Sequence, residues 1–455
     1  GSEQRTGFSL RAQANALVGQ VKHLLTDRGD YSVARRMAGT AFGIRIFNAG
    51  VVYVSQVLLA RWMGGYEFGI YVYVWTWLIL VGGLAPLGIA YSTQRFIPEY
   101  TAAGERDRLR GFLRGSRLLS LGLGALAGII GLAAFLALRG FISEHYHLPL
   151  LIAMACLPAF ALSSAQDGIA RSYNWVLSAL VPGFVVQPLI VLAIIVTEHF
   201  AGIDIDATFA MAATATAIWV TIVLQTTLLQ RRLSKAIEPG LKRYEMGRWF
   251  QTALPILLVD GFYFLLTYVD ILVLKVFVDP AQIGIYYAVT KTLVLISFIY
   301  YAVSASYAHR FSEAYFAGER EKLKSFVADA TRWTFWPSLA FAFVLLALGK
   351  PILMLFGEGF IEGYPLMFVL TIGLLARASI GPGERLLIMV GQQRLCAAIY
   401  ATAFFTNLGL CLALVPYFGL VGAAASTATA IVVESTLLFV MAKRRLGLHA
   451  FFWGR

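Results

Sequence analysis

The sequence predicts an all-α membrane protein, with twelve transmembrane helices in two parallel six-helix lobes around a central cleft. Composition, the spacing of apolar stretches and an internal repeat support this fold class. Of the 455 residues, 59% are apolar and 14% are charged, with a mean hydropathy of +0.72. An ordinary soluble domain has roughly 45–50% apolar and about 25% charged residues. The composition therefore excludes a soluble enzyme, a disordered chain and a disulfide scaffold.

Apolar stretches long enough to cross a bilayer recur along the whole chain. A transmembrane helix needs about 20 mostly apolar residues. The expected spans are 38–60, 69–92, 117–138, 148–170, 177–197, 207–229, 249–275, 283–307, 333–349, 364–389, 395–416 and 419–442.

Basic residues are divided unequally between the loops on the two sides of these spans. If the N-terminus is cytoplasmic, the inward-facing segments hold 29 of the 37 Lys and Arg residues. The outward side holds only Arg61, Arg139, Lys275 and Lys350. Because basic residues favour the cytoplasmic side, both termini are predicted to be cytoplasmic. The net charge of +12 then reflects topology and contact with anionic lipids, so no nucleic-acid partner is expected.

The polar and basic segment 1–36 precedes the first span. Apolar residues recur in it at helical spacing: Leu10, Ala14, Leu17, Val18, Val21, Leu24 and Leu25. This pattern is typical of an amphipathic helix in the cytoplasmic membrane interface. A solvated helix that packs on the protein is the alternative.

The chain contains an internal repeat. LLARWMGGYEFGIYVYV (58–74) corresponds to LVLKVFVDPAQIGIYYAV (272–289), and RFIPEYTAAGER (95–106) corresponds to RFSEAYFAGER (310–320). Both matches have an offset of 214 to 215 residues. We therefore predict an N-lobe at 37–235 and a C-lobe at 236–455. Since six spans is an even number, the lobes share one orientation and are related by an axis along the membrane normal.

Two parallel lobes around a cleft are typical of alternating-access transporters, which bind substrate between the lobes. A membrane-embedded polysaccharide polymerase or ligase is the rival class. It would need a catalytic surface outside the bilayer, whereas the expected outward loops are short. No phosphate-binding loop, HExxH, GxSxG or paired-cysteine signature occurs. No enzyme activity, cofactor or metal is therefore expected.

The repeated segments, together with APLGIAYSTQRFIPEY (85–100), resemble the polysaccharide transporter (Wzx-like) family. That family belongs to the multidrug/oligosaccharidyl-lipid/polysaccharide (MOP) superfamily. The likeness is sharpest across 55–110 and 265–325. It implies a flippase that moves undecaprenyl-diphosphate-linked oligosaccharide from the inner to the outer leaflet of a bacterial inner membrane. Membrane lipids and the polysaccharide polymerase machinery are the further partners implied. Lipid II flippases usually have fourteen spans, and multidrug extruders lack the RFIPEY-type loop.

Ionisable residues inside spans are costly and are therefore functional candidates. Arg45 and Asn48 share one face of the first expected helix, and Asp260, Tyr263 and Asp270 share one face of the seventh. The repeat offset of 215 maps Arg45 onto Asp260 and Asn48 onto Tyr263. We expect both stripes to line the cleft.

The other charged candidates lie in the eighth, tenth and twelfth expected helices. The substrate-binding candidates are Arg45, Asn48, Lys291, Arg377 and Tyr263. The candidates for ion coupling or gating are Asp260, Asp270, Glu384, Arg385 and Glu434. The four basic and four acidic candidates cancel, so a cationic cleft requires that some carboxylates form ion pairs. Ion pairs that only hold helices together are the alternative for each residue, and especially for Glu384 and Arg385.

Two further expectations concern aromatic residues and a second function. Aromatic side chains are expected in the interfacial belts rather than in a sugar site; these are Trp75, Trp77, Tyr300 and Tyr301. The alternative function is a cation- or proton-coupled multidrug exporter. Arg45 disfavours cationic drugs, while Asp260 and Asp270 leave this alternative open.

Overall fold

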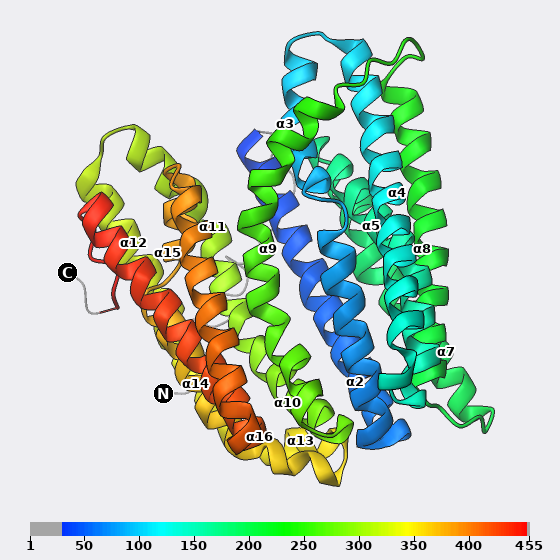
Figure 1. Cartoon of the computed structure of the whole chain (residues 1–455). Coiled ribbons are helices and arrows are strands. Elements are labelled where there is room, and N and C mark those ends of the chain that lie inside the picture. Colours follow the sequence, from blue (N-terminus) through cyan, green and yellow to red (C-terminus); the bar gives the residue numbers. More distant parts are fainter. Residues whose placement is uncertain (1–29, 453–455) are drawn as a thin grey trace, which may run out of the picture.

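The structure is a computed structural model that describes residues 30–452, and this part of the chain is helical without any strand (Figure 1). A helix satisfies all of its own backbone hydrogen bonds, which suits a chain with apolar surroundings. The elements of the first half are α2 (Asp30–Leu84), α3 (Ile89–Ala102), α4 (Arg106–Leu138), α5 (His147–Ser172), α6 (Val176–Val181), the π-helical turn η3 (Pro182–Val186), α7 (Gln187–Phe200) and α8 (Ala207–Ala236). Those of the second half are α9 (Met246–Phe277), α10 (Pro280–Leu293), α11 (Ser297–Phe316), α12 (Arg320–Ala347), α13 (Gly349–Phe356), α14 (Tyr364–Ser379), α15 (Gly383–Met389) and α16 (Gln393–Leu446).

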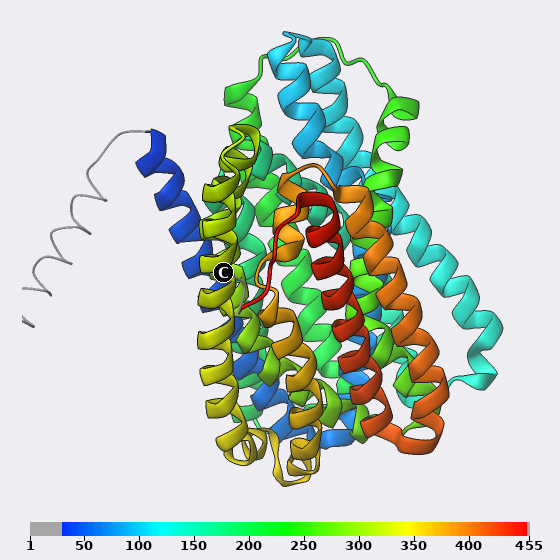
Figure 2. The same ribbon diagram turned by 90° about the vertical axis from the view of Figure 1, so that its left-hand side faces the viewer.

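Two helices are interrupted by a glycine and double back. Gly64 in α2 has φ 79° and ψ 164°, and Gly419 in α16 has φ 53° and ψ −128°. Glycine adopts positive φ without the steric cost that a Cβ brings. Figure 1 shows the chain reversing at the lower end of α2 and of α16, and Figure 2 shows the α16 reversal again.

The described residues hold eight helices that are long and apolar enough to span a membrane, or up to ten if each of two bent pairs counts as one span. The protein is thus a multi-pass helical membrane protein. The expected count of twelve differs because α2 with α3, and α16, each form one long helical segment that covers two expected spans. Gly64 lies between the first and second of these spans, and Gly419 begins the twelfth.

Helix α2 begins at Asp30, before the expected start of the first span at residue 38. The interfacial helix expected from Leu10 to Leu25 lies outside the described residues.

The repeated loops have the same backbone conformation. Gly104, between α3 and α4, has φ +70°, and Gly318, between α11 and α12, has φ +71°. Around Gly104, the amide of Glu105 donates to the carbonyl of Tyr100 at 3.0 Å. Around Gly318, the amide of Glu319 donates to the carbonyl of Ala314, also at 3.0 Å. The sequence repeat therefore corresponds to a repeated turn.

Equivalent helices of the two halves meet where α2 reverses. A Cβ on Gly69 would lie 1.7 Å from the carbonyl oxygen of Pro280, and a Cβ on Gly284 would lie 3.1 Å from that of Gly65. The offset of 215 residues exchanges these two contacts. We call this end of the molecule, with Gly64 and the α9–α10 connection, the closed end.

The buried apolar side chains of the described residues are divided between three clusters. One large cluster contains residues of both halves, including Phe68 of α2 and Tyr287 of α10. Toward the other end it gives way to two clusters, one around Phe112 and Trp249 and one around Phe311. We call this other end, with the α3–α4, α8–α9 and α11–α12 connections, the basic end (Figure 1).

Candidate functional site

Two cavities occupy the inner faces of the two halves. The first, the N-side cavity, has a volume of about 540 Å³ and is lined mainly by α2, α5, α8 and the η3–α7 region. The second, the C-side cavity, has a volume of about 310 Å³ and is lined by α9, α11, α14, α15 and α16. Helices from α9 onward also contribute Tyr268, Tyr287 and Lys291 to the N-side cavity. This cavity therefore includes residues from both halves.

The N-side cavity is rich in amide and hydroxyl groups. Asn48 lines it, as expected from the stripe on the first helix. Its other amide and hydroxyl side chains are Ser55, Gln56, Ser163, Ser164, Gln187, Thr214, Thr221 and Gln225. Trp75, Tyr71 and Tyr268 add aromatic rings. Such a wall can hydrogen-bond to polyols and stack against sugar rings.

Lys291 is the cation that lines the N-side cavity. Its Nζ lies 4.9 Å from the centroid of the Tyr287 ring. Among the described residues it makes no ion pair, although Asp270 acts on it electrostatically at longer range. The only carboxylate in the lining is Asp167, and this group accepts a 2.8 Å hydrogen bond from Arg171. The positive charge of Lys291 is therefore not cancelled within the cavity.

Arg45 lies between the two halves, at the edge of the N-side cavity. Its guanidinium carbon is 5.8 Å from the ring centroid of Phe184, which lines that cavity. Its electrostatic neighbours include Arg171 from the first half and Arg385 from the second. Arg45 forms no ion pair within residues 30–452 and is exposed.

The C-side cavity brings together the polar residues expected on the seventh and tenth helices. Asp260 and Tyr263 of α9 line it together with Glu384 and Arg385 of α15. Asp260 and Glu384 interact electrostatically, and the hydroxyl of Tyr300 donates to Glu384 at 3.3 Å. Neither Glu384 nor Arg385 forms an ion pair within the described residues, so the alternative of an ion pair is not seen for them. Adjacent residues on a short helix point to different sides, which explains why they do not meet.

Arg377 lines the C-side cavity but is engaged by another residue. Its Nη2 donates to Glu434 Oε2 at 2.5 Å, and the Glu434 side chain is only 2% exposed. This ion pair joins α14 to α16. For Arg377 and Glu434 the structure thus matches the alternative of an ion pair that holds helices together.

Asp270 lies apart from both cavities and is fully engaged. It accepts hydrogen bonds from the Tyr286 hydroxyl at 2.7 Å and from the Ile271 amide at 2.8 Å. The Thr427 hydroxyl adds a third at 3.3 Å. The expectation that Asp270 lines the cleft with Asp260 is therefore wrong, because the lower half of α9 packs against α16.

Asp167 was missed among the sequence-based candidates, although it lies within the helix expected over 148–170. The sequence signal is that Asp167 is an ionisable residue inside an expected span, and the structure adds an equivalence between the two halves. The turn at Asn174, with φ 56°, matches the turn at Gly391, with φ 84°, 217 residues later. The same offset maps Asp167 onto Glu384. Asp167 and Glu384 therefore occupy equivalent positions in the cavities of the two halves.

Three of the four aromatic residues expected in the interfacial belts line a cavity. Trp75 lines the N-side cavity, and Tyr300 and Tyr301 line the C-side cavity. Trp77 lies instead on the outer groove between α4 and α5 and is 38% exposed. No group of three His, Cys, Asp or Glu side chains suited to a metal ion occurs within the described residues.

Comparison with known proteins identifies the fold. Neither family models nor curated proteins give a match to this sequence. Among solved structures, the inward-facing conformation of a multidrug resistance MATE family transporter of the MOP superfamily superposes with a TM-score of 0.73. That pair has 16% sequence identity, with 88% of this chain and 94% of the other covered.

Two other solved structures have the same fold. A MOP superfamily transporter from Pyrococcus furiosus gives a TM-score of 0.67 at 15% identity, with 93% and 97% covered. The lipid II flippase MurJ in an inward closed conformation gives 0.68 at 16% identity, with 88% and 87% covered. The chain therefore has the fold of these transporters of the MOP superfamily.

Proposed function

We propose that this protein flips an undecaprenyl-diphosphate-linked oligosaccharide from the cytoplasmic to the outer leaflet of a bacterial inner membrane. The main support for this proposal is the N-side cavity, where amide, hydroxyl and aromatic groups surround Lys291. This lysine has no ion-pair partner among the described residues. The same fold occurs in a lipid II flippase, which favours a lipid-linked substrate.

In this proposal, Lys291 and Arg45 bind the diphosphate, and Asn48 and Tyr263 contact the sugars. A diphosphate has about two negative charges, and Arg and Lys bind phosphate through charge-assisted hydrogen bonds. Arg377, the other cation expected to bind the diphosphate, is held by Glu434. We therefore assign Arg377 a structural role.

The topology in this proposal has twelve spans, with α2–α3 and α16 each contributing two, in two parallel lobes at 37–235 and 236–455. The reciprocal contacts of Gly69 and Gly284 support an axis along the membrane normal. With both termini cytoplasmic, the basic end faces the cytoplasm. In this proposal, the cleft between the halves opens to the inner leaflet at that end. The higher TM-score with the inward-facing MATE transporter, 0.73, than with the outward-facing one, 0.64, favours an inward-facing conformation.

The membrane potential is sufficient to drive such a substrate. It is negative inside and moves an anion outward, with a gain of roughly 2.3 kcal/mol per charge per 100 mV. Two charges gain about 4–5 kcal/mol, so no coupling ion is required. Flux in proteoliposomes should therefore follow an imposed potential at fixed pH and sodium. Flux that follows a sodium or pH gradient and ignores the potential would contradict a uniport.

The test of the site is flipping by reconstituted Lys291→Ala, with a lipid-linked oligosaccharide as substrate. Losing one charge-assisted hydrogen bond, worth about 1.5–3 kcal/mol, should weaken transport roughly tenfold to a hundredfold. Lys291→Arg should retain most of the activity. The matched control is Lys350→Ala. Lys350 also lies over a tyrosine ring, at 5.3 Å from the centroid of Tyr364, but lines neither cavity. Normal flipping by both Lys291→Ala and Arg45→Ala would refute the anion contacts.

A second candidate function, export of cationic drugs coupled to a proton or cation, rests on Asp260 and Glu384. These two acidic groups share the C-side cavity without a basic partner within the described residues. An antiporter could protonate them or bind a cation there. Efflux of a cationic dye that is abolished by Asp260→Asn and Glu384→Gln, and that persists in Lys291→Ala, would favour this function over the flippase.

A further inference from the structure

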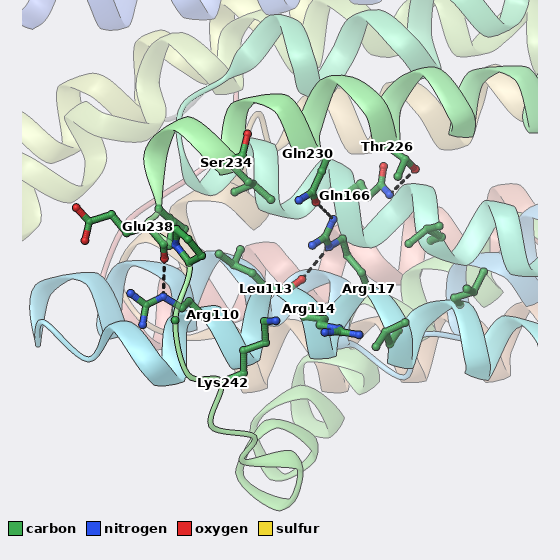
Figure 3. Close-up of a pocket in the computed structure, with 17 residues that line it drawn as sticks. Arg110, Leu113, Arg114, Arg117, Gln166, Thr226, Gln230, Ser234, Glu238 and Lys242 are labelled. Atoms are coloured by element: carbon green, nitrogen blue, oxygen red, sulfur yellow. Dashed lines mark hydrogen bonds between the residues drawn. The ribbon is translucent and has the colours of Figure 1, made fainter.

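A third cavity, separate from the two that face the cleft, lies at the basic end of the first half. It has a volume of about 750 Å³ and is formed by α4, α8 and the connection between α8 and α9. Figure 3 shows Arg110, Arg114 and Arg117 on α4, Gln230 on α8 and Lys242 on the connection. We call this cavity the linker pocket.

Three of the four cations in the linker pocket are not neutralised. Arg110 pairs with Asp107 at 2.8 Å and donates to the carbonyl oxygen of Glu238 at 2.7 Å, so it supports the connection. Arg117 contacts only uncharged acceptors, the Leu113 carbonyl at 2.9 Å and Gln230 at 3.0 Å. Arg114 and Lys242 have no hydrogen-bond or ion-pair partner within the described part of the chain.

The single carboxylate of the pocket does not compensate this charge. Glu238 pairs with Arg106 at 3.2 Å, and its side chain is 81% exposed. In Figure 3 its carboxylate points away from Arg114 and Arg117. The pocket therefore presents three positive charges to whatever occupies it.

The other part of the pocket is apolar and faces the lipid. It is formed by Leu118, Leu121 and Leu162. Leu118 is 53% exposed, and only 17% of the apolar window of α4 is buried inside the protein. An apolar wall directly below a cluster of cations matches the two parts of a phospholipid, its acyl chains and its phosphate.

We propose that the linker pocket binds an anionic phospholipid of the leaflet at the basic end. Arg114, Arg117 and Lys242 hold the headgroup phosphate, and the acyl chains lie along Leu118 and Leu121. A soluble phosphate or nucleotide would use the cations but leave the apolar wall without a function. The membrane lipid uses both.

Such a lipid would connect the two halves of the molecule. Lys242 lies on the only described covalent connection between α8 and α9, whereas Arg114 and Arg117 belong to α4. The amide of Arg243 already donates to the carbonyl of Asp107 at 2.9 Å. A Cβ on Gly111 would lie 1.9 Å from the Arg243 carbonyl oxygen, so the connection is packed tightly against α4. A bound phosphate adds a bridge at this contact and stabilises the arrangement seen here.

The test uses the purified full-length protein in detergent and measures its thermal unfolding midpoint during titration. The four probes are phosphatidylglycerol, phosphatidylcholine, glycerol phosphate and inorganic phosphate. We expect phosphatidylglycerol to raise the midpoint, and the other three to have little effect. The double variant Arg114→Gln with Lys242→Gln should weaken the apparent affinity for phosphatidylglycerol roughly thirtyfold. Each removed charge should weaken it about fivefold, and the two factors multiply.

The matched control is Arg231→Gln with Lys235→Gln, which removes two exposed charges near the same end but outside the pocket. It should shift the affinity by less than about threefold, because exposed charges are screened. Arg114→Lys with Lys242→Arg should preserve binding and show that the site folds. Equal losses of phosphatidylglycerol affinity in the test and control variants would show that general surface charge, and not the linker pocket, causes the effect. Equal stabilisation by phosphatidylcholine or by inorganic phosphate would overturn the lipid assignment.

Discussion

Arg377 shows that a charged residue inside a span need not contact the substrate. It lines the C-side cavity, and its guanidinium is occupied by Glu434 on a neighbouring helix. Lys291 lines the other cavity and has no ion-pair partner within residues 30–452. Sequence alone identifies both as costly charges, but only the packing of α14 on α16 separates the paired cation from the free one.

This difference leads to a prediction about stability. Arg377→Ala leaves the buried Glu434 without a partner, and removing one member of a buried ion pair costs about 3–5 kcal/mol. The thermal unfolding midpoint in detergent should therefore fall. The double variant Arg377→Met with Glu434→Leu should recover much of the loss, since it leaves no unpaired charge. If the single variant is as stable as the wild type, the pair does not hold α14 to α16.

Which residues form the candidate site was predictable in part. Asn48, Tyr263 and Asp260 lie at cavities because a helix period places polar stripes on one face. Asp270 belongs to the same stripe but is buried and accepts a hydrogen bond from Thr427 of α16, because one helix can contact different partners along its length. The residue types of Trp75 and Tyr300 do not indicate whether these side chains lie at the membrane interface or on a cavity wall.

At the scale of elements, the contact between α2 and α10 depends on glycine. A methyl group on Gly69 would lie 1.7 Å from the backbone oxygen of Pro280, whereas one on Gly284 would lie 3.1 Å from the oxygen of Gly65. The first requires the two helices to separate, and the second requires only a shift of a few tenths of an ångström.

Gly69→Ala should therefore destabilise the closed end and expose it to water. Gly284→Ala, the matched variant at the equivalent position, should change the stability and the water exposure of the closed end much less. The measurement is the labelling rate of a cysteine placed at Ala281 by a water-soluble maleimide, which should rise strongly in Gly69→Ala only. Similar rates in both variants would show that this contact does not seal the closed end.

A second element-scale feature is the ionic network that joins α3, α4 and α9 at the basic end. Glu245, just before α9, accepts from the Tyr100 hydroxyl at 3.0 Å and pairs with Arg108 at 3.0 Å and Arg248 at 3.4 Å. Burial by itself raises the pKa of the Glu245 carboxyl, but the hydrogen bond from Tyr100 and the two guanidinium charges outweigh it. The pKa therefore lies below its usual value of 4.5.

A carboxyl whose pKa is lowered by folding stabilises the folded state above its unfolded pKa. This contribution is lost as the pH falls below about 4.5 toward the folded pKa. The thermal midpoint of the wild type should thus drop in this range, and Glu245→Gln should show a lower midpoint at neutral pH with a smaller drop. Glu238→Gln is the control, because Glu238 forms only an exposed pair. An unchanged pH profile in Glu245→Gln would exclude this network as the cause.

At the scale of the whole molecule, the proposed alternating access requires the closed end to open. A Cβ built on Gly65 lies 3.7 Å from the Cβ of Ala281, within the range of about 3.5–4.5 Å found in disulfides. The three native cysteines, Cys156, Cys396 and Cys411, are all buried and free.

The double variant Gly65→Cys with Ala281→Cys should therefore crosslink the halves on oxidation. Transport by the oxidised protein should fall to background and return with a reducing agent, while substrate binding from the basic end should persist. Gly65→Cys alone controls for the substitution. Full transport by the oxidised double variant would mean that this end does not open.

The overall architecture was predictable to a greater extent than the contacts between helices. The apolar stretches locate the helices, because a span requires about 20 such residues. The matching turns at Gly104 and Gly318 follow from the sequence repeat. The continuity of α2 and of α16 through Gly64 and Gly419 was not predictable, since a short connection with a glycine is compatible with both a loop and a kinked helix.

The reciprocal contact between α2 and α10 also has an evolutionary consequence. In a symmetric dimer of identical six-helix chains, the surface around Gly69 would meet its own copy, as in any isologous interface. One gene would then encode both positions 45 and 260, and both would have to be arginine or both aspartate. Joining two copies into one polypeptide removes this restriction. If the two halves arose by duplication of one six-helix gene, the opposite charges of Arg45 and Asp260 arose after that duplication, and a reconstructed ancestor should have the same residue at both positions.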